Sequence, residues 1–294
     1  MQDYIIRAVT DDGLIRAFGC ITKETTQKAR DFHNTSPVAT AALGRLLSCA
    51  AMMGAMLKGE KDLVTLQLNG GGPLGRVLCV SGSNSMVKGY VDNPYADVPL
   101  NANGKLDVGT AVGRSGFFTV IQDLGLKEPY IGKIPLVSGE VGDDLAKYFA
   151  VSEQVPSVVA VGVLVDKDLS VKNSGGFIIQ VMPGATDEDI TKLEQNISKI
   201  TSVTSMLEDG LNIEEIIGVA LSGFDFHFTD KKEMGYYCNC SKERVRKVLK
   251  SIGKDEIEAI IKEDGKAELD CHFCNKKYQF DMDDLNSILS EIKN

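Results

Sequence analysis

The first part of the chain carries short runs of alternating hydrophobic and polar residues, a pattern typical of β-strands. Residues 4–22 hold two such runs around Asp11, Asp12 and Gly13, which predicts a hairpin with the glycine in its turn. Further strands are predicted at 63–68, 75–80, 86–91, 117–122, 130–137, 158–165 and 177–181. Helices are predicted at 37–57, after Ser36 as N-cap, and at about 143–151. Many strands with a few helices favour an α+β domain over residues 1–183.

From residue 184 the hydrophobic period changes to that of helices. One helix is predicted from Thr186, as N-cap, to Gly210, and a second one at 213–221. The stripe of the first helix and the aromatic residues beyond the second comprise Ile190, Leu193, Ile197, Ile200, Leu207, Phe224, Phe226 and Phe228. An amphipathic helix must bury its apolar stripe on a neighbour or remain unstable. We therefore expect a helical linker over residues 184–232.

Composition describes an acidic globular protein of 294 residues, 43% hydrophobic and 25% charged, which is enough for two or three domains. The net charge of −9 disfavours nucleic acid as a partner, because phosphate binding requires a concentrated basic surface. The apolar segment 37–57 contains Arg45 and Ser48 near its centre, so it is too polar to insert into a membrane. No signal-peptide pattern is present at the N-terminus, and we expect a cytoplasmic protein without a membrane partner.

The candidate chemistry lies in the cysteines. Three of the seven occur in apolar surroundings and are predicted to be buried thiols: Cys20, Cys49 and Cys79. The other four form a CxC and a CxxC pair separated by thirty residues: Cys238, Cys240, Cys271 and Cys274. Four thiolates can hold one zinc ion with metal–sulfur bonds of about 2.3 Å. When oxidised, each pair can close a short disulfide, and a strained ring of the CxC kind is a labile one.

The last segment, residues 233–294, is smaller than the size at which a domain usually stabilises itself. A structural metal would supply the missing free energy of folding. We expect a small C-terminal Cys₄ zinc domain that unfolds when its metal is removed.

The spacing of the four cysteines at the end of a chain of this length resembles the 33 kDa chaperonin family of redox-regulated bacterial chaperones. Blocks in the first two thirds of the chain are similar to that family as well. They are Asn93-Pro94, Pro99-Leu100-Asn101, Gly104-Lys105-Leu106-Asp107-Val108-Gly109, the eight residues from Asp123 to Tyr130, and Ser152-Glu153-Gln154. The resemblance implies a cytoplasmic, ATP-independent holdase that is inactive while reduced and zinc-bound. It further implies that oxidation releases zinc and that the active form is a homodimer.

These implications lead to a hypothesis about the switch. Short loops favour disulfides between Cys238 and Cys240 and between Cys271 and Cys274. Loss of zinc would unfold the C-terminal region and uncover the linker stripe for unfolded or oxidatively damaged client proteins. The candidate client-binding residues are Ile190, Leu193, Ile197, Ile200, Phe224, Phe226 and Phe228.

Two other classes of function stay open. A zinc-ribbon factor associated with nucleic acid or the ribosome is disfavoured by the acidic composition, and a CxxC thiol oxidoreductase by the lack of a βαβ pattern around Cys271. The run from Gly70 to Gly75 matches a dinucleotide fingerprint, but a strand rather than a helix follows it. With three histidines and no GxSxG motif, we expect no enzymatic activity.

Overall fold

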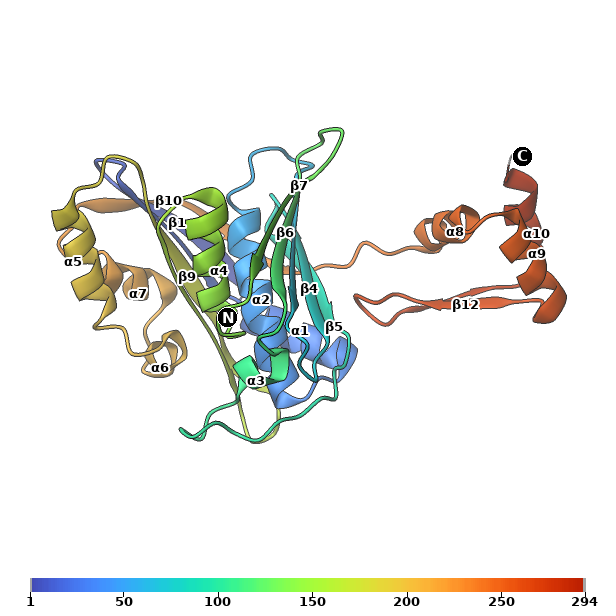
Figure 1. Cartoon of the computed structure of the whole chain (residues 1–294), viewed down its shortest axis with the longest axis horizontal. Coiled ribbons are helices and arrows are strands. Elements are labelled where there is room, and N and C mark those ends of the chain that lie inside the picture. The colour runs from blue at the N-terminus through green and yellow to red at the C-terminus, as the bar shows by residue number, and fades with distance from the viewer. Residues whose placement is uncertain (1, 293–294) are drawn as a thin grey trace. The chain divides into compact units, whose positions relative to one another are not determined.

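The computed structural model describes residues 2–292 of the chain. The chain divides into two compact units, Met1–Tyr237 (unit 1) and Cys238–Asn294 (unit 2), which are drawn in blue to orange and in red in Figure 1. The α+β class is confirmed, since helices and antiparallel sheets occur together. In this state the predicted linker, residues 184–232, belongs to unit 1. Its separation from that unit in another state stays a prediction.

Unit 1 is built on two sheets. The first has the order β10-β1-β2-β9-β8 and the second the order β11-β5-β4-β3-β6-β7. The strands of the first sheet are β1 (Tyr4–Thr10), β2 (Ile15–Ile21), β8 (Ser157–Val165), β9 (Val171–Val181) and β10 (Phe226–Glu233). Those of the second are β3 (Leu63–Asn69), β4 (Arg76–Gly82), β5 (Met86–Val91), β6 (Phe117–Asp123), β7 (Tyr130–Pro135) and β11 (Gly235–Tyr236). The paired strands are antiparallel except β11, which runs parallel to β5.

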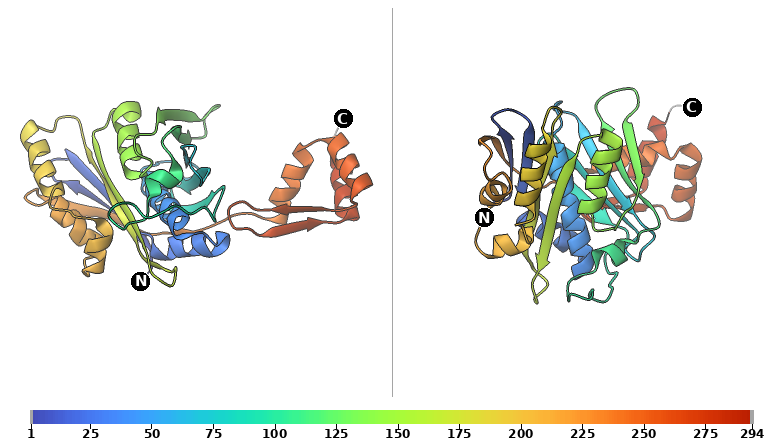
Figure 2. Two further views of the ribbon diagram at one scale, coloured as in Figure 1. Left: turned by 60° about the horizontal axis from the view of Figure 1, so that its bottom comes forward. Right: turned by 60° about the vertical axis from the view of Figure 1, so that its left-hand side comes forward.

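Helix α2 (Pro37–Gly54) is the centre of unit 1. It packs against strands of both sheets, and Figure 2 shows it between them. The Ser36 side chain accepts a hydrogen bond from the Ala39 amide and starts the helix, as the sequence predicts. By length and composition α2 could cross a membrane, but 89% of it is buried inside the protein, as expected of a core helix. The other helical segments before the linker are α1 (Lys23–His33), α3 (Val108–Val112), α4 (Gly142–Tyr148) and η1 (Phe149–Glu153).

The linker contains three helices: α5 (Asp187–Ile197), α6 (Val203–Glu208) and α7 (Ile213–Ala220). The prediction of one helix from Thr186 to Gly210 is therefore wrong. The chain leaves α5 through a tightened turn in which the Ile200 amide bonds to the Ile197 carbonyl at 3.0 Å. Ser202 then caps a new helix, because its side chain accepts a hydrogen bond from the Ser205 amide at 3.1 Å.

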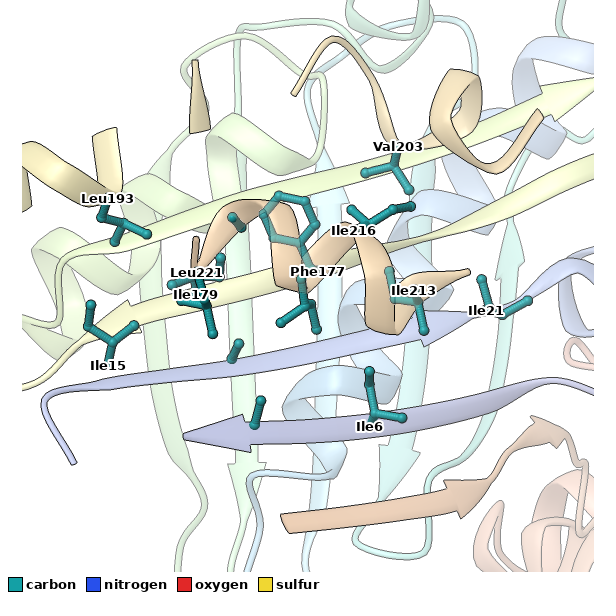
Figure 3. Close-up of a cluster of buried hydrophobic side chains, with 14 residues drawn as sticks. Ile6, Ile15, Ile21, Phe177, Ile179, Leu193, Val203, Ile213, Ile216 and Leu221 are labelled. Carbon is teal, nitrogen blue, oxygen red and sulfur yellow. The ribbon is translucent and has the colours of Figure 1, made fainter. Parts of the chain in front are cut away.

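The three linker helices cover one face of the first sheet. Figure 3 shows α7 lying over strands of this sheet, with Ile213 on the side of Ile6 and Ile21 and Ile216 on the side of Val203. A glycine permits this approach: a Cβ atom on Gly19 would lie 2.7 Å from both Ile213 Cγ1 and Ile217 Cδ1. The close fit buries the apolar face of α7 completely.

Unit 2 combines three helices with one hairpin. Its elements are α8 (Lys242–Ser251), α9 (Lys254–Glu263), β12 (Ala267–Asp270), β13 (Lys277–Phe280) and α10 (Met282–Glu291). Its core is small and consists of Leu249, Ile257, Tyr278, Phe280, Leu285 and Ile288. Cys240 and Cys271 pack at the edge of this core, so the predicted metal site and the core of the unit share side chains.

Candidate metal centre and redox site

The four predicted ligands come together in unit 2. The sulfur atoms of Cys238, Cys240, Cys271 and Cys274 all lie within 4.8 Å of one another. The Cys238 and Cys271 sulfurs are 3.6 Å apart, and those of Cys240 and Cys274 are 3.4 Å apart. A tetrahedron with metal–sulfur bonds of about 2.3 Å has sulfur–sulfur edges of about 3.8 Å. The four thiols therefore fit a metal ion of the size of zinc.

The CxxC pair occupies the turn of the β12–β13 hairpin. The Cys271 amide bonds to the Lys276 carbonyl at 3.0 Å, while the Cys271 carbonyl accepts hydrogen bonds from the amides of Cys274 and Asn275. Asn275 adopts a left-handed conformation with φ of 54°, which asparagine tolerates better than most residues. This tight turn directs both sulfurs to the same side of the hairpin.

The CxC pair lies at the start of unit 2, directly before helix α8. Ser241 caps that helix by accepting a hydrogen bond from the Arg244 amide at 3.2 Å, as the sequence predicts. Arg244 also donates to the Asn239 carbonyl between the two cysteines. The helix terminus thus fixes the backbone of the CxC pair opposite the hairpin turn.

The cysteines of the cluster differ in acidity. Burial raises the pKa of Cys238 and of Cys274 above the ordinary thiol value. Burial also opposes ionisation of Cys240, but hydrogen bonds from Tyr278 and the neighbouring thiols outweigh it and lower the pKa of Cys240 to about 7. Because the thiolate is the reactive and metal-binding form, Cys240 is the strongest candidate for ionisation in the metal-free site.

The three remaining cysteines are chemically protected. Cys20, Cys49 and Cys79 are completely buried in unit 1, as predicted. Burial raises the pKa of the Cys20 thiol to about 12 and raises the pKa values of Cys49 and Cys79 as well. Thiol chemistry at neutral pH is therefore confined to the cluster in unit 2.

Three of the five basic residues of α8 pair with acidic side chains within unit 2. Lys242 pairs with Asp284 at 2.6 Å, and Arg246 and Lys250 both pair with Glu291 of α10. These pairs offset the positive charge that a phosphate-binding helix would need. The site also lacks the setting of a thiol oxidoreductase, whose CxxC pair lies at a helix N-terminus, because here that pair lies in a hairpin turn.

The seven candidate client-binding residues are partly brought together. Leu193 is buried in the core between the linker and the first sheet, and Ile197, Ile200, Phe224 and Phe226 pack against that core. Ile190 lies on α5 outside this cluster, half-buried. Phe228 is 44% exposed and contacts Phe226 edge to face, with ring centroids 5.7 Å apart. In this state most of the linker stripe is covered.

Two contacts, one at the cysteine cluster and one in the linker, were missed from the sequence. The Tyr278 hydroxyl donates a 3.0 Å hydrogen bond to the Cys240 sulfur, and Glu214 of α7 accepts hydrogen bonds from Tyr4 and Lys231. An alternating strand pattern places Tyr278 on the inner face of the hairpin, but no sequence signal reveals its partner. The Glu214 contacts join residues separated by up to 210 positions, which only the fold determines.

Comparisons with known proteins agree with this architecture. The 33 kDa chaperonin of Clostridioides difficile (strain 630) is 50% identical over 292 residues, covering 99% of this chain and 100% of that protein. The 33 kDa chaperonin of Alkaliphilus metalliredigens (strain QYMF) is also 50% identical, with the same coverage. The crystal structure of the 33 kDa chaperonin (HSP33) of Thermotoga maritima matches with a TM-score of 0.91 at 36% identity, covering 99% of this chain and 98% of that one. A family profile described as "Hsp33 protein" matches residues 3–281, and the chain therefore belongs to the Hsp33 family.

Proposed function

We propose that this protein is a redox-regulated, ATP-independent holdase chaperone that is inactive while reduced and zinc-bound. The observation that carries the proposal is the cluster of four sulfurs within 4.8 Å, in a unit with a small apolar core. Structural zinc contributes about 10–16 kcal/mol to the folding of small domains, more than such a core supplies. Bound zinc would hold Cys238, Cys240, Cys271 and Cys274 as thiolates and stabilise the fold of unit 2.

Peroxide is the oxidant class that suits these thiolates. A thiolate attacks one peroxide oxygen, so that an S–O bond forms, the O–O bond breaks and hydroxide leaves. A second thiolate then displaces hydroxide from the sulfenic sulfur and forms the S–S bond. Each disulfide thus consumes one peroxide and two protons and yields two waters. We place the disulfides between Cys238 and Cys240 and between Cys271 and Cys274, which leaves no thiolate to hold zinc.

Unit 2 is connected to the linker through the backbone of strands β11 and β10. Cys238 follows β11, and β11 follows β10, the strand that contributes Lys231 to the contact with Glu214 on α7. We infer that unfolding of unit 2 weakens the hold of β10 and of the linker helices on the first sheet. The apolar faces of α5 and α7, together with Phe224, Phe226 and Phe228, would then bind unfolded clients.

The proposal also covers the clients, the oligomeric state and the cellular location of the protein. Clients are unfolded or oxidatively damaged proteins, the active form is a homodimer, and the protein acts in the cytoplasm without nucleic acid, a membrane partner or enzymatic turnover. The reducing environment of the cytoplasm suits a switch whose resting state is four thiols. The ion pairs between α8 and α10 favour this function over a nucleic-acid-binding zinc ribbon.

The decisive experiment measures zinc content and suppression of client aggregation on one sample, before and after peroxide. The reduced protein should hold one zinc and leave aggregation unchanged, whereas the oxidised protein should lose zinc and suppress aggregation. Cys20→Ala is the matched control, because this thiol is buried and should not contribute to the response. Zinc that stays bound through oxidation, or protection that does not follow its loss, would contradict the proposal.

A further inference from the structure

Tyr278 lies outside the cysteine cluster but forms a hydrogen bond with one of its sulfurs. It lies on β13 opposite Leu269 of β12, and its side chain is 6% exposed within the core of unit 2. Its hydroxyl is 3.0 Å from the Cys240 sulfur. The hydroxyl of a buried tyrosine usually forms a hydrogen bond, whereas phenylalanine would fill the same apolar space without one. The hydroxyl therefore has a role beyond packing.

The contact joins the two arms of the cluster. Tyr278 belongs to the same hairpin as Cys271 and Cys274, while Cys240 belongs to the CxC arm before α8. The hydrogen bond thus attaches the Cys240 sulfur to the hairpin independently of any metal. A thiolate sulfur accepts hydrogen bonds and cannot donate them, so the hydroxyl must be the donor in the resting state.

We propose that Tyr278 is a positioning residue that sets how readily the cluster is oxidised. Its hydroxyl orients the Cys240 sulfur toward the other three and withdraws electron density from that sulfur. Hydrogen bonds to metal-binding side chains fix their orientation and tune the site. A thiolate sulfur that accepts a hydrogen bond attacks peroxide more slowly, because the bond withdraws negative charge and lowers the nucleophilicity of the sulfur. The hydroxyl therefore restrains the switch until the oxidant level is high.

This proposal rests on the proposed function for the role of peroxide. Its second part, that Tyr278 raises the affinity of the cluster for the metal, does not depend on peroxide. The reacting bonds are those given above: S–O forms as O–O breaks, and S–S forms as S–O breaks. Tyr278 takes no part in these exchanges. It changes the rate of the first step and the affinity for the metal.

The test uses full-length Tyr278→Phe, which keeps the ring and removes the donor. We expect the affinity for zinc to fall on the order of tenfold and the rate of peroxide oxidation of the zinc-loaded protein to rise by a similar factor. With cobalt(II) in place of zinc, the sulfur-to-metal charge-transfer absorption should shift. That shift reports the electronic state of the sulfurs, which a purely structural role would not change.

Ile288→Val is the matched control, because it removes one methyl group from the same core and no hydrogen-bond donor to a sulfur. If this variant, at equal loss of melting temperature, oxidises as fast as Tyr278→Phe, the effect is one of stability and the proposal is wrong. Wild-type zinc affinity and oxidation rate in Tyr278→Phe would overturn it as well.

A second variant should have the opposite effect on the rate of oxidation. Replacement of Tyr278 by 3-fluorotyrosine keeps the shape and strengthens the hydrogen-bond donor, so oxidation should be slower than in the wild type. If it is not slower, the electronic part of the proposal fails even where Tyr278→Phe does not fold. Should peroxide leave zinc bound in every protein, the proposed function fails, while zinc affinity and the cobalt spectrum still decide the role of Tyr278.

Discussion

The Tyr4 hydroxyl donates a 2.7 Å hydrogen bond to the carboxylate of Glu214 and ties linker helix α7 to strand β1. The other carboxylate oxygen accepts from Lys231 of β10, also at 2.7 Å. One side chain of the linker is thus held by the two strands at the edge of the first sheet. Because β10 leads to unit 2 along the chain, this contact is well placed to couple the fold of unit 2 to the linker.

Removing the charge of Glu214 should loosen α7 without oxidation. Glu214→Gln loses the ion pair with Lys231 but keeps an acceptor for Tyr4, so we expect a cost of about 1 kcal/mol, roughly a fivefold rise in local opening. Hydrogen exchange of the α7 amides in the reduced protein measures this. Glu194→Gln, which removes the same charge from an exposed position of α5, is the control. Equal exchange in both variants would show that the contact does not hold the helix.

The same contact predicts a dependence on pH. Burial alone would raise the pKa of Glu214, but hydrogen bonds from Lys231 and Tyr4 outweigh it and hold the pKa below its ordinary value of 4.5. A lowered pKa in the folded state means that the stabilisation is present above 4.5 and is lost as pH falls through the folded value. The local opening of α7, measured as exchange relative to the intrinsic rate of an unprotected amide at the same pH, should therefore rise below pH 4.5 in the wild type. In Glu214→Gln this rise should be smaller; an identical profile would assign it to other groups.

Two glycines, Gly19 beneath α7 and Gly218 within α7, should respond to alanine in opposite directions. Gly19→Ala places a Cβ atom against Ile213 and Ile217, and overpacking of this kind costs about 1–3 kcal/mol. Gly218→Ala adds a methyl group where no atom lies within 4 Å and should strengthen the helix by about 1 kcal/mol.

Binding of a hydrophobic dye to the reduced proteins provides the measurement. It should increase in Gly19→Ala and decrease in Gly218→Ala relative to the wild type. The prediction fails if both variants change in the same direction, because then the packing of α7 does not control exposure of the apolar face.

Removing the metal under reducing conditions should unfold unit 2 selectively. A chelator with a thiol reductant is expected to abolish the ordered amide signals of α8, α9 and α10, because the small core cannot replace the free energy of metal binding. Signals of α2, buried between the sheets of unit 1, should persist. Ordered helices in metal-free unit 2 would show that its core suffices alone.

The disulfide pattern can be checked by peptide mapping of the oxidised protein. In the folded state short sulfur–sulfur contacts cross between the two arms, from Cys238 to Cys271 at 3.6 Å and from Cys240 to Cys274 at 3.4 Å. Loop length nevertheless favours Cys238–Cys240 and Cys271–Cys274 once unit 2 loosens. We expect these short loops in the final product, with cross-arm bonds only at early times. Cross-arm bonds as the stable product would mean that unit 2 stays folded during oxidation.

The sequence by itself determined the elements and the chemistry. Alternation and capping residues located most strands and helix α2, because these signals depend on neighbours in the chain. The CxC and CxxC spacing identified the cluster, since two close pairs need only one loop closure to meet. The sequence failed at residues 198–202, where a capping serine outweighed a continuous hydrophobic stripe and divided one predicted helix into α5 and α6.

Only the tertiary structure decided which distant groups meet. The contacts of Tyr4 with Glu214, of Gly19 with Ile213, and of Tyr278 with Cys240 join segments that carry no local sign of one another. Their partners are set by the register of the strands and by the angle at which helices cross them. Hydrogen bonds and steric contacts act over a few ångströms in space, and sequence patterns record only separation along the chain. The candidate chemistry of the site can therefore be predicted from the sequence, while the contacts of Tyr278 and Glu214 are visible only in the fold.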